Sequence, residues 1–203
     1  MSQLATYGAL ERLGPIVTTG EAATALGMSL SSTSHLLSRL ENEGQVHRLR
    51  RGLWSIGPRR PDPFMVVPDL TRPHPSYISF LSALNHHGII DQLPRDIEVA
   101  SLDRARSIET GGATYAIHHL PPHLFAGWTE TARGPVATPE KAIFDVCYVA
   151  AAHTGRQRRI PELELPTDFD WSRCDRWVAR IESGRLRTLT TRGIAWARKR
   201  AVR

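Results

Sequence analysis

The chain begins with apolar residues at helical spacing. Leu4, Tyr7, Leu10 and Leu13 recur every three residues and predict a helix over 4–13. A Gly-Pro pair follows and ends this helix, because proline lacks the amide donor that a helix interior needs. We expect this segment to be the first helix of a small three-helix domain.

A short helix, a tight turn and a longer helix are predicted next. Thr18 offers a hydroxyl cap to the short helix, over 20–26, and Gly27 ends it because glycine tolerates the left-handed conformation. Ser29 caps the longer helix, over 29–43. The side chains expected to face the core from this longer helix are those of Thr33, Leu36, Leu37 and Leu40.

Polar residues remain on the other side of the longer helix: Ser31, Ser32, His35 and Arg39. Short hydroxyls near a helix N-terminus reach phosphates or base edges, and the helix dipole favours an anion there. These four residues are therefore candidates for contact with duplex DNA. The competing interpretation is that the serines only cap and solubilise the helix.

Two short strands enclose a basic turn and predict a hairpin. The strands span 45–49 and 53–56, and Gly52 between them can adopt a positive φ. The basic side chains of this hairpin are those of Arg48, Arg50 and Arg51. Each phosphate that such a side chain neutralises adds salt-dependent affinity, so the hairpin favours the DNA-binding interpretation of the helix before it.

Prolines mark the end of this predicted domain. Residues 58–63 are rich in proline, which is typical of a linker. We therefore expect a winged helix-turn-helix DNA-binding domain over 1–57 and a second domain over 64–203. The expected fold class is α+β, with an N-terminal winged helix-turn-helix followed by a mixed α/β C-terminal domain.

The second domain is predicted to mix strands and helices. Strands are expected over 64–67, 97–100, 113–118 and 163–165, with a hairpin formed by 128–131 and 136–137. Helices are expected over 76–88, 138–149 and 171–182. The last stretch, 185–203, holds seven basic residues and no acid. It suits contact with DNA, RNA or an acidic protein, and it equally suits a solvated helix.

The composition favours a polyanionic partner and a reducing compartment. The 203 residues carry a formal net charge of +6 and give a pI of about 10.0. The two cysteines, Cys147 and Cys174, lack the spacing of a disulfide framework or a zinc site. No leader-like segment opens the sequence, and no apolar run is long enough to cross a bilayer. We therefore expect a cytoplasmic protein without membrane contact.

Two motifs in the second domain resemble a known family. The first is Tyr-Ile-Ser-Phe-Leu-Ser-Ala-Leu at 77–84, followed by His87 and Gly88, and the second is Val-Ala-Thr-Pro-Glu-Lys-Ala at 136–142, followed by Asp145. With the N-terminal winged helix, they resemble the AbiEi antitoxins, the transcription-regulator half of abortive-infection toxin–antitoxin pairs. The resemblance implies a repressor that binds operator DNA upstream of its own operon. It also implies that the second domain counters a nucleotidyltransferase-like toxin.

The motif residues themselves have structural explanations. Thr138, Pro139 and Glu140 have the pattern of a helix start, with a hydroxyl cap, a proline and a carboxylate in the first turn. Asp145 lies four residues after Lys141, which is the spacing of a helical ion pair. An ion pair is therefore favoured over a chemical role for Asp145.

No residue is predicted to be catalytic, and no cofactor or metal is expected. The sequence has no phosphate-cradling loop followed by lysine, no nucleophile elbow and no His-Glu-x-x-His motif. The best metal candidates are His86, His87, His118, His119 and His123. Adjacent histidines point in different directions, so a metal site would need ligands from elsewhere in the chain.

A second class of function competes with the antitoxin. In it, the chain is a free-standing winged-helix regulator whose C-terminal domain senses a ligand or dimerises. A homodimer is an expectation in both cases, because paired half-sites about 34 Å apart suit such domains, although the sequence has no coiled-coil heptad. A nucleotidyltransferase-like gene immediately downstream would favour the antitoxin, and its absence the free-standing regulator.

Overall fold

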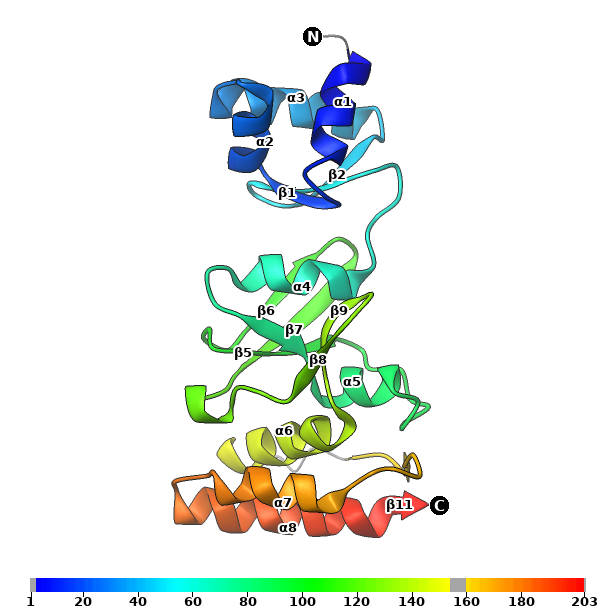
Figure 1. Ribbon diagram of the computed structural model, residues 1–203, viewed down its shortest axis with the longest axis vertical. Coiled ribbons are helices and arrows are strands. Elements are labelled where there is room, and N and C mark those ends of the chain that lie inside the picture. The colour runs from blue at the N-terminus through cyan, green and yellow to red at the C-terminus, as the bar shows by residue number, and fades with distance from the viewer. Residues whose placement is uncertain (1–2, 154–159, 203) are drawn as a thin grey trace. The chain divides into compact units, whose positions relative to one another are not determined.

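The computed structural model describes residues 3–153 and 160–202 (Figure 1). The chain divides into two compact units, which are described separately. The first unit combines Met1–Asp69 with the short segment Glu109–Ala113. The second unit combines Leu70–Ile108 with Thr114–Arg203. Both units contain helices and strands, so the chain is a mixed α and β protein, and the linker expected over 58–63 lies inside the first unit.

The first unit is built from helices and a small antiparallel sheet. The elements in chain order are α1 (Gln3–Glu11), β1 (Ile16–Thr18), α2 (Thr19–Leu26), α3 (Leu30–Asn42), β2 (Val46–Arg50) and β3 (Leu53–Ile56). The sheet order is β1-β3-β2, with β3 antiparallel to both neighbours. The three helices and the hairpin lie within a few residues of their predicted positions, whereas strand β1 was missed because three residues are too few for an alternating pattern.

Apolar side chains from α1, α2, α3 and the three strands of the first unit meet in one core. Its buried members are Leu10, Val17, Ala22, Leu26, Leu37, Leu40, Val46 and Trp54. Leu13, which we expected on the buried side of the first helix, is instead 41% exposed. The helix ends at Glu11, two residues before Leu13, so the helical spacing no longer holds there.

A six-stranded mixed sheet dominates the second unit. Its strands are β4 (Ser76–Ile78), β5 (Ile97–Ser101), β6 (Arg106–Thr110), β7 (Ala113–His119), β8 (Trp128–Thr131) and β9 (Gly134–Ala137). The order across the sheet is β6-β7-β5-β4-β9-β8. Strand β4 pairs antiparallel with β5 and parallel with β9, so it lies in the interior of the sheet. The predicted hairpin over 128–131 and 136–137 is confirmed as the antiparallel pair β8 and β9.

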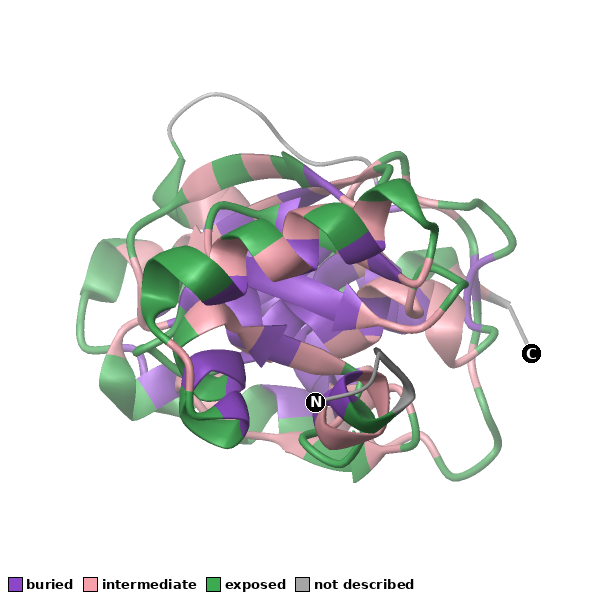
Figure 2. Ribbon diagram, turned by 90° about the horizontal axis from the view of Figure 1, so that it is seen from above, coloured by how far each residue is buried: buried purple, intermediate pink, exposed green. Residues whose placement is uncertain are grey.

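Helices complete the second unit. They are α5 (Phe80–His86), α6 (Pro139–Ala152), α7 (Trp171–Ala179) and α8 (Gly184–Arg200), with a short 3-10 turn at Pro122–Leu124. Helix α4 (Pro63–Thr71) lies in the first unit up to Asp69, and its last residues, Leu70 and Thr71, belong to the second unit. Helix α6 packs against α5, α7 and α8, and α6 to α8 run from yellow to red in Figure 1. A short parallel pair joins β10 (Leu163–Glu164), which precedes α7, to β11 (Ala201–Val202), which follows α8. Figure 2 shows buried residues gathered on the strands and on one side of the helices.

The strand predicted over 64–67 is wrong, because this segment belongs to helix α4. The Asp62 carboxylate accepts a hydrogen bond from the Phe64 amide (2.9 Å), and proline at the first helical position suits a helix start. Phe64 and Val67 are both buried, three residues apart. A short apolar run is compatible with both a strand and a buried helix, and here the cap at the start of the segment favours the helix.

The helix predicted over 76–88 is half wrong, since its first residues form strand β4. Tyr77 and Ile78 pair with β5, and the Ser79 amide continues this pairing by donating to the Glu98 carbonyl (3.0 Å). Phe80 then takes a φ of 56°, which interrupts any helix running through it. Helix α5 starts only at this residue, so sheet pairing overrides the helical spacing of the apolar residues.

The remaining differences are two element ends and one missed strand. Helix α7 stops at Ala179, three residues before the predicted end, while the predicted helix over 138–149 extends to Ala152. Strand β6 was missed, because its alternation is short and lies next to the Gly-Gly turn. Within the described residues, no helix is long and apolar enough to cross a membrane.

Candidate nucleic-acid interface

The turn between α2 and α3 is fixed by local hydrogen bonds. Thr18 and Glu21 form a capping box, in which the Thr18 hydroxyl accepts from the Glu21 amide (3.1 Å) and the Glu21 carboxylate accepts from the Thr18 amide (2.7 Å). Gly27 ends α2 in the left-handed conformation, with a φ of 62°. The Ser29 hydroxyl then caps α3 by accepting from the Ser32 amide (3.1 Å). The start of α3 is thus held independently of any partner.

Helix α3 has one buried and one exposed side. Thr33, Leu37 and Leu40 are completely buried and Leu36 is partly buried, as the spacing predicted. The predicted DNA-facing residues Ser31, Ser32, His35 and Arg39 are all exposed. Ordinary helical geometry therefore places these four side chains on the solvent side of the same helix.

The contacts of these four residues differ. The Ser32 hydroxyl accepts a hydrogen bond from the Ser29 hydroxyl (2.9 Å), so part of its bonding capacity serves the cap. The Arg39 guanidinium lies 3.9 Å from the Glu43 carboxylate in an exposed pair, which stabilises little and leaves the cation accessible. The side chains of Ser31 and His35 make no hydrogen bond or ion pair with the described residues. The serines therefore combine a capping role with exposed hydroxyls.

Trp54 connects the β2–β3 hairpin to α2. Its indole N–H donates to the Thr19 hydroxyl (2.9 Å), and its ring is fully buried. The Arg48 guanidinium lies over this ring, 5.0 Å from its centroid, while the Arg48 amide donates to the Glu41 carboxylate (3.0 Å). Arg48 is exposed at its charged end, so the tryptophan orients a cation that solvent can reach.

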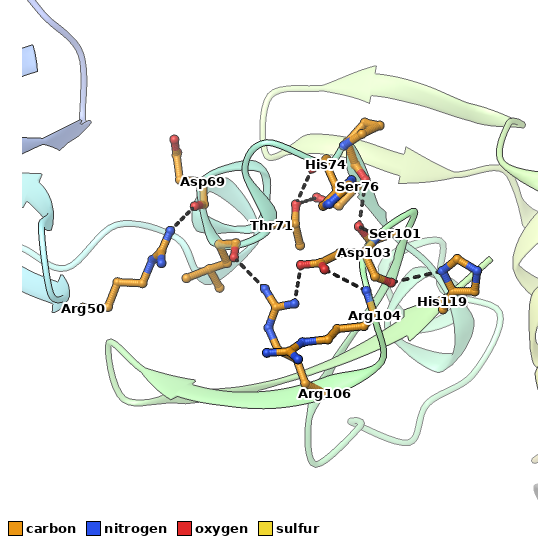
Figure 3. Close-up of polar contacts among 12 residues, drawn as sticks. Arg50, Asp69, Thr71, His74, Ser76, Ser101, Asp103, Arg104, Arg106 and His119 are labelled. Carbon is orange, nitrogen blue, oxygen red and sulfur yellow. Dashed lines mark hydrogen bonds and ion pairs between the residues drawn. The ribbon is translucent and has the colours of Figure 1, made fainter. Parts of the chain in front are cut away.

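The two arginines at the hairpin turn differ in their contacts. Gly52 has a φ of 78°, as the turn prediction required. The Arg50 guanidinium donates to the carbonyl oxygen of Asp69 in the same unit (3.0 Å, Figure 3). Arg51 is exposed and makes no hydrogen bond or ion pair with the residues that the structure describes. Arg51 is therefore the freer of the two cations.

A separate set of charges is sealed inside the second unit. Lys141 and Asp145 form an ion pair, as their spacing predicted, and both side chains are completely buried. The Asp145 carboxylate also accepts from the Tyr77 hydroxyl (3.1 Å) and the Ser79 hydroxyl (2.7 Å). The ammonium group of Lys141 is surrounded by aromatic rings, with centroids at 4.8 Å (Trp177), 5.0 Å (Phe144) and 5.6 Å (Tyr77).

Burial controls the titration of this cluster. Burial raises the pKa of Asp145, and the neighbouring Lys141 partly offsets the rise. Burial likewise lowers the pKa of Lys141, with Asp145 opposing the change. The pKa of Tyr77 is raised well above its ordinary value by burial and by the Asp145 charge. The side chains of Lys141 and Asp145 have no exposed surface, so no reactant reaches them from solvent.

A second polar network lies around the end of β5 in the second unit (Figure 3). Arg106 forms an ion pair with Asp103, which lowers the pKa of that carboxyl, and also donates to the Leu70 carbonyl (3.3 Å). The His119 ring contacts the Asp103 carbonyl oxygen (3.2 Å). These groups satisfy one another, which is what a structural network requires.

The histidines considered as metal ligands have other contacts. His87 lies 2.7 Å from the Ala137 carbonyl oxygen, and His118 lies 3.8 Å from the Glu98 carboxylate. Among residues 3–153 and 160–202, no group of three or more His, Cys, Asp or Glu side chains is arranged to hold a metal ion. Both cysteines are buried, and burial raises the pKa of the Cys147 thiol to about 12.

Comparison with known proteins gives a match to one segment of the chain. Residues 9–57 match the model of a family described as "Transcriptional regulator, AbiEi antitoxin". The predicted AbiEi resemblance is confirmed. No curated protein matches the chain.

The AbiEi match covers α2, α3 and the β2–β3 hairpin, and so includes every residue predicted to contact DNA. Those residues are Ser31, Ser32, His35, Arg39, Arg48, Arg50 and Arg51. The two motifs that first indicated the family, at 77–84 and 136–142, lie outside the matched segment. The AbiEi resemblance of the second unit therefore stays a prediction.

Sequence reasoning missed three features of this candidate interface. Trp54 and Thr19 form the hydrogen bond that ties the hairpin to α2. A tryptophan in the second strand of a predicted hairpin whose first strand carries an arginine was the available signal. Leu30, the first residue of α3, is 62% exposed, whereas an apolar residue at a helix start suggests a core position. No feature of the sequence distinguishes this leucine from the buried ones.

Proposed function

We propose that the chain is a DNA-binding transcriptional regulator whose first unit is a winged helix-turn-helix. The observation that carries the proposal is the exposure of polar and cationic side chains on α3 and on the hairpin that follows it, within the AbiEi-matched segment. Helix α3 enters the major groove, and its N-terminal residues meet base edges. Arg48 and Arg51 contact phosphates beside the groove.

We further propose that the regulator represses its own operon and that its second unit counters a nucleotidyltransferase-like toxin in the cytoplasm. The support is the description of the matched family as an antitoxin, together with the two motifs of the second unit. Co-expression with a nucleotidyltransferase-like gene lying immediately downstream tests the second role. Growth should be restored by the full chain, and continued arrest would refute neutralisation.

The DNA-binding role is tested by fluorescence anisotropy across a salt series. The two probes are the duplex upstream of the gene and a scrambled duplex of the same composition. We expect the upstream duplex to bind at least a hundredfold more tightly, which corresponds to about 3 kcal/mol. Equal affinity for both duplexes would remove the role of sequence reader.

Variants on α3 and on the hairpin should separate specificity from general affinity. Replacing Ser31, Ser32 and His35 together by alanine should reduce the preference for the upstream duplex while affinity for the scrambled one changes little. Ser29 stays unchanged, so that the helix cap is kept. Equal weakening on both duplexes would show that these side chains contact phosphates and not bases.

A free-standing regulator is the second candidate, because the family match is confined to residues 9–57. In that case the second unit senses a ligand or forms a homodimer. Sedimentation of the full chain with and without DNA measures the dimer directly. Specific DNA binding without any effect on a neighbouring toxin would favour this candidate.

A further inference from the structure

Leu30 is an apolar side chain in a polar setting. It is the first residue of α3 and is 62% exposed, and it is followed directly by the exposed Ser31 and Ser32. A single exposed leucine needs no explanation by itself. Its position does, because it stands at the end of the helix from which DNA-binding domains of this kind read bases.

The geometry of a helix directs this side chain outward along the axis. In an α-helix each Cα–Cβ bond tilts toward the N-terminus, so the side chain of a first residue extends beyond the helix end. The preceding Met28 is partly buried and packs against the core, and Leu37 is completely buried. The core therefore has its apolar contacts without Leu30, which remains available to a partner.

We propose that Leu30 reads thymine, by packing against the C5-methyl group in the major groove of the operator. This inference rests on the proposed DNA-binding function and adds a specificity-determining residue to it. The thymine methyl is the apolar feature by which the major groove distinguishes thymine from cytosine, and apolar side chains recognise it. Arg39, Arg48 and Arg51 are also exposed on α3 and the β2–β3 hairpin, and these cations favour a polyanion over an apolar protein surface as the partner of this unit.

The other large exposed hydrophobic side chains in the described chain have different settings. Leu13 follows α1, Leu93 lies in the loop before β5, and Trp196 lies on α8 beside Arg200, whose guanidinium is 5.4 Å from its ring centroid. Leu13 belongs to the same unit as Leu30 but is not on α3. It supplies a matched control for removal of an exposed leucine.

The test is a methyl-deletion scan of the upstream duplex with the full-length protein. In each duplex one thymine is replaced by deoxyuridine, which removes the methyl group and keeps every hydrogen-bonding group. We expect the wild-type protein to lose about fourfold in affinity at one thymine in each half-site, the effect of one exposed methyl-sized apolar group. Leu30→Ala should bind the unmodified duplex at least as weakly as the wild-type protein binds the deoxyuridine duplex. The variant should also lose no further affinity when that deoxyuridine is present.

The controls separate this inference from the function on which it rests. Leu13→Ala should retain the wild-type affinity and the wild-type deoxyuridine profile. If the wild-type protein does not prefer the upstream duplex, the proposed function fails and the inference fails with it. If it does prefer that duplex but no single deoxyuridine weakens binding, or if Leu30→Ala keeps the same profile, the thymine contact alone is overturned.

A protein partner at Leu30 would give a different result. In that case Leu30→Ala would shift the oligomeric state in sedimentation without DNA, while its deoxyuridine profile would match that of the wild type. This outcome also overturns the proposal. Circular dichroism checks that the variant is folded, and alanine at this position is compatible with the helix because it has the highest helix propensity.

Discussion

The two units use charge in opposite ways. On α3 and the β2–β3 hairpin, Arg39, Arg48 and Arg51 are exposed and lie next to polar side chains that have few partners. In the second unit, Lys141 and Asp145 are completely buried and enclosed by aromatic rings. Exposed cations cost little and stay available to a phosphate, whereas a buried pair stabilises only while both members are present. A charged motif therefore indicates a function only after its burial is known.

The largest effect should come from breaking the buried pair. Asp145→Ala leaves the Lys141 ammonium without its carboxylate and should lower the free energy of unfolding by about 3–5 kcal/mol, measured by urea denaturation. Replacing both partners, with Lys141→Met and Asp145→Leu, should recover most of this loss. Asp168→Ala removes an exposed carboxylate and should change stability by less than about 0.5 kcal/mol. An equally small loss of stability for Asp145→Ala would contradict the burial of the Lys141–Asp145 pair.

Gly127 tests how tightly the aromatic surroundings of Lys141 are packed. A Cβ atom at this position would lie 2.8 Å from Trp177 and 3.1 Å from Lys141, and the glycine has a φ of 87°. Gly127→Ala should therefore destabilise by about 2–4 kcal/mol through overpacking and backbone strain. Gly184→Ala, at the open start of α8, should be neutral or slightly stabilising. Equal effects for both variants would show that the surroundings can relax.

The thiol of Cys147 should make stability depend on alkaline pH. Burial raises its pKa from 9.0 to about 12 in the folded chain, so the unfolded state ionises first. Its contribution is complete below about pH 9 and is lost as the pH rises toward 12, with about 2 kcal/mol gone by pH 10.5. Cys147→Ala should show a shallower fall in stability between pH 8 and 10.5 than the wild type. Parallel curves would indicate that the thiol ionises equally in both states.

The smallest effect should be on the salt dependence of DNA binding, and it should distinguish the two arginines of the hairpin turn. Replacing Arg50 and Arg51 together by alanine should weaken binding to all duplexes and reduce the salt slope by about one or two units. Because the Arg50 guanidinium also bonds to the Asp69 carbonyl, most of this change should come from Arg51→Ala alone. Arg12→Ala, also exposed in the first unit, serves as the control. An unchanged slope in the double variant would remove the phosphate role of this turn.

Local signals predicted the first unit well. Caps at Thr18 and Ser29 and glycines at 27 and 52 fix the ends of helices and turns within a few residues, and the structure has all four. The Lys141–Asp145 pair was also predictable, because i, i+4 contacts depend on helix geometry alone. What spacing could not give was its burial, which depends on rings that come from distant parts of the chain.

The errors come from contacts that are distant in sequence. Residues 76–78 have apolar spacing suited to a helix but lie in the interior of a sheet, where pairing with β5 and β9 satisfies their backbone. The bond from Arg50 to Asp69 crosses nineteen positions and could not be inferred from the hairpin. Leu30 looked like its buried neighbours, since exposure is set by the packing of the whole unit.

The position of Trp54 makes its fluorescence a built-in signal of binding to the first unit. The sequence contains five tryptophans, and Trp54 is the one that lies in the first unit, sealed from solvent with its indole N–H bonded to Thr19 and a guanidinium above its ring. A phosphate that draws Arg48 away from the ring would change the electric field on the indole. A protein in which the other four tryptophans are replaced by phenylalanine would then signal occupancy through its intrinsic emission, without a dye on either molecule.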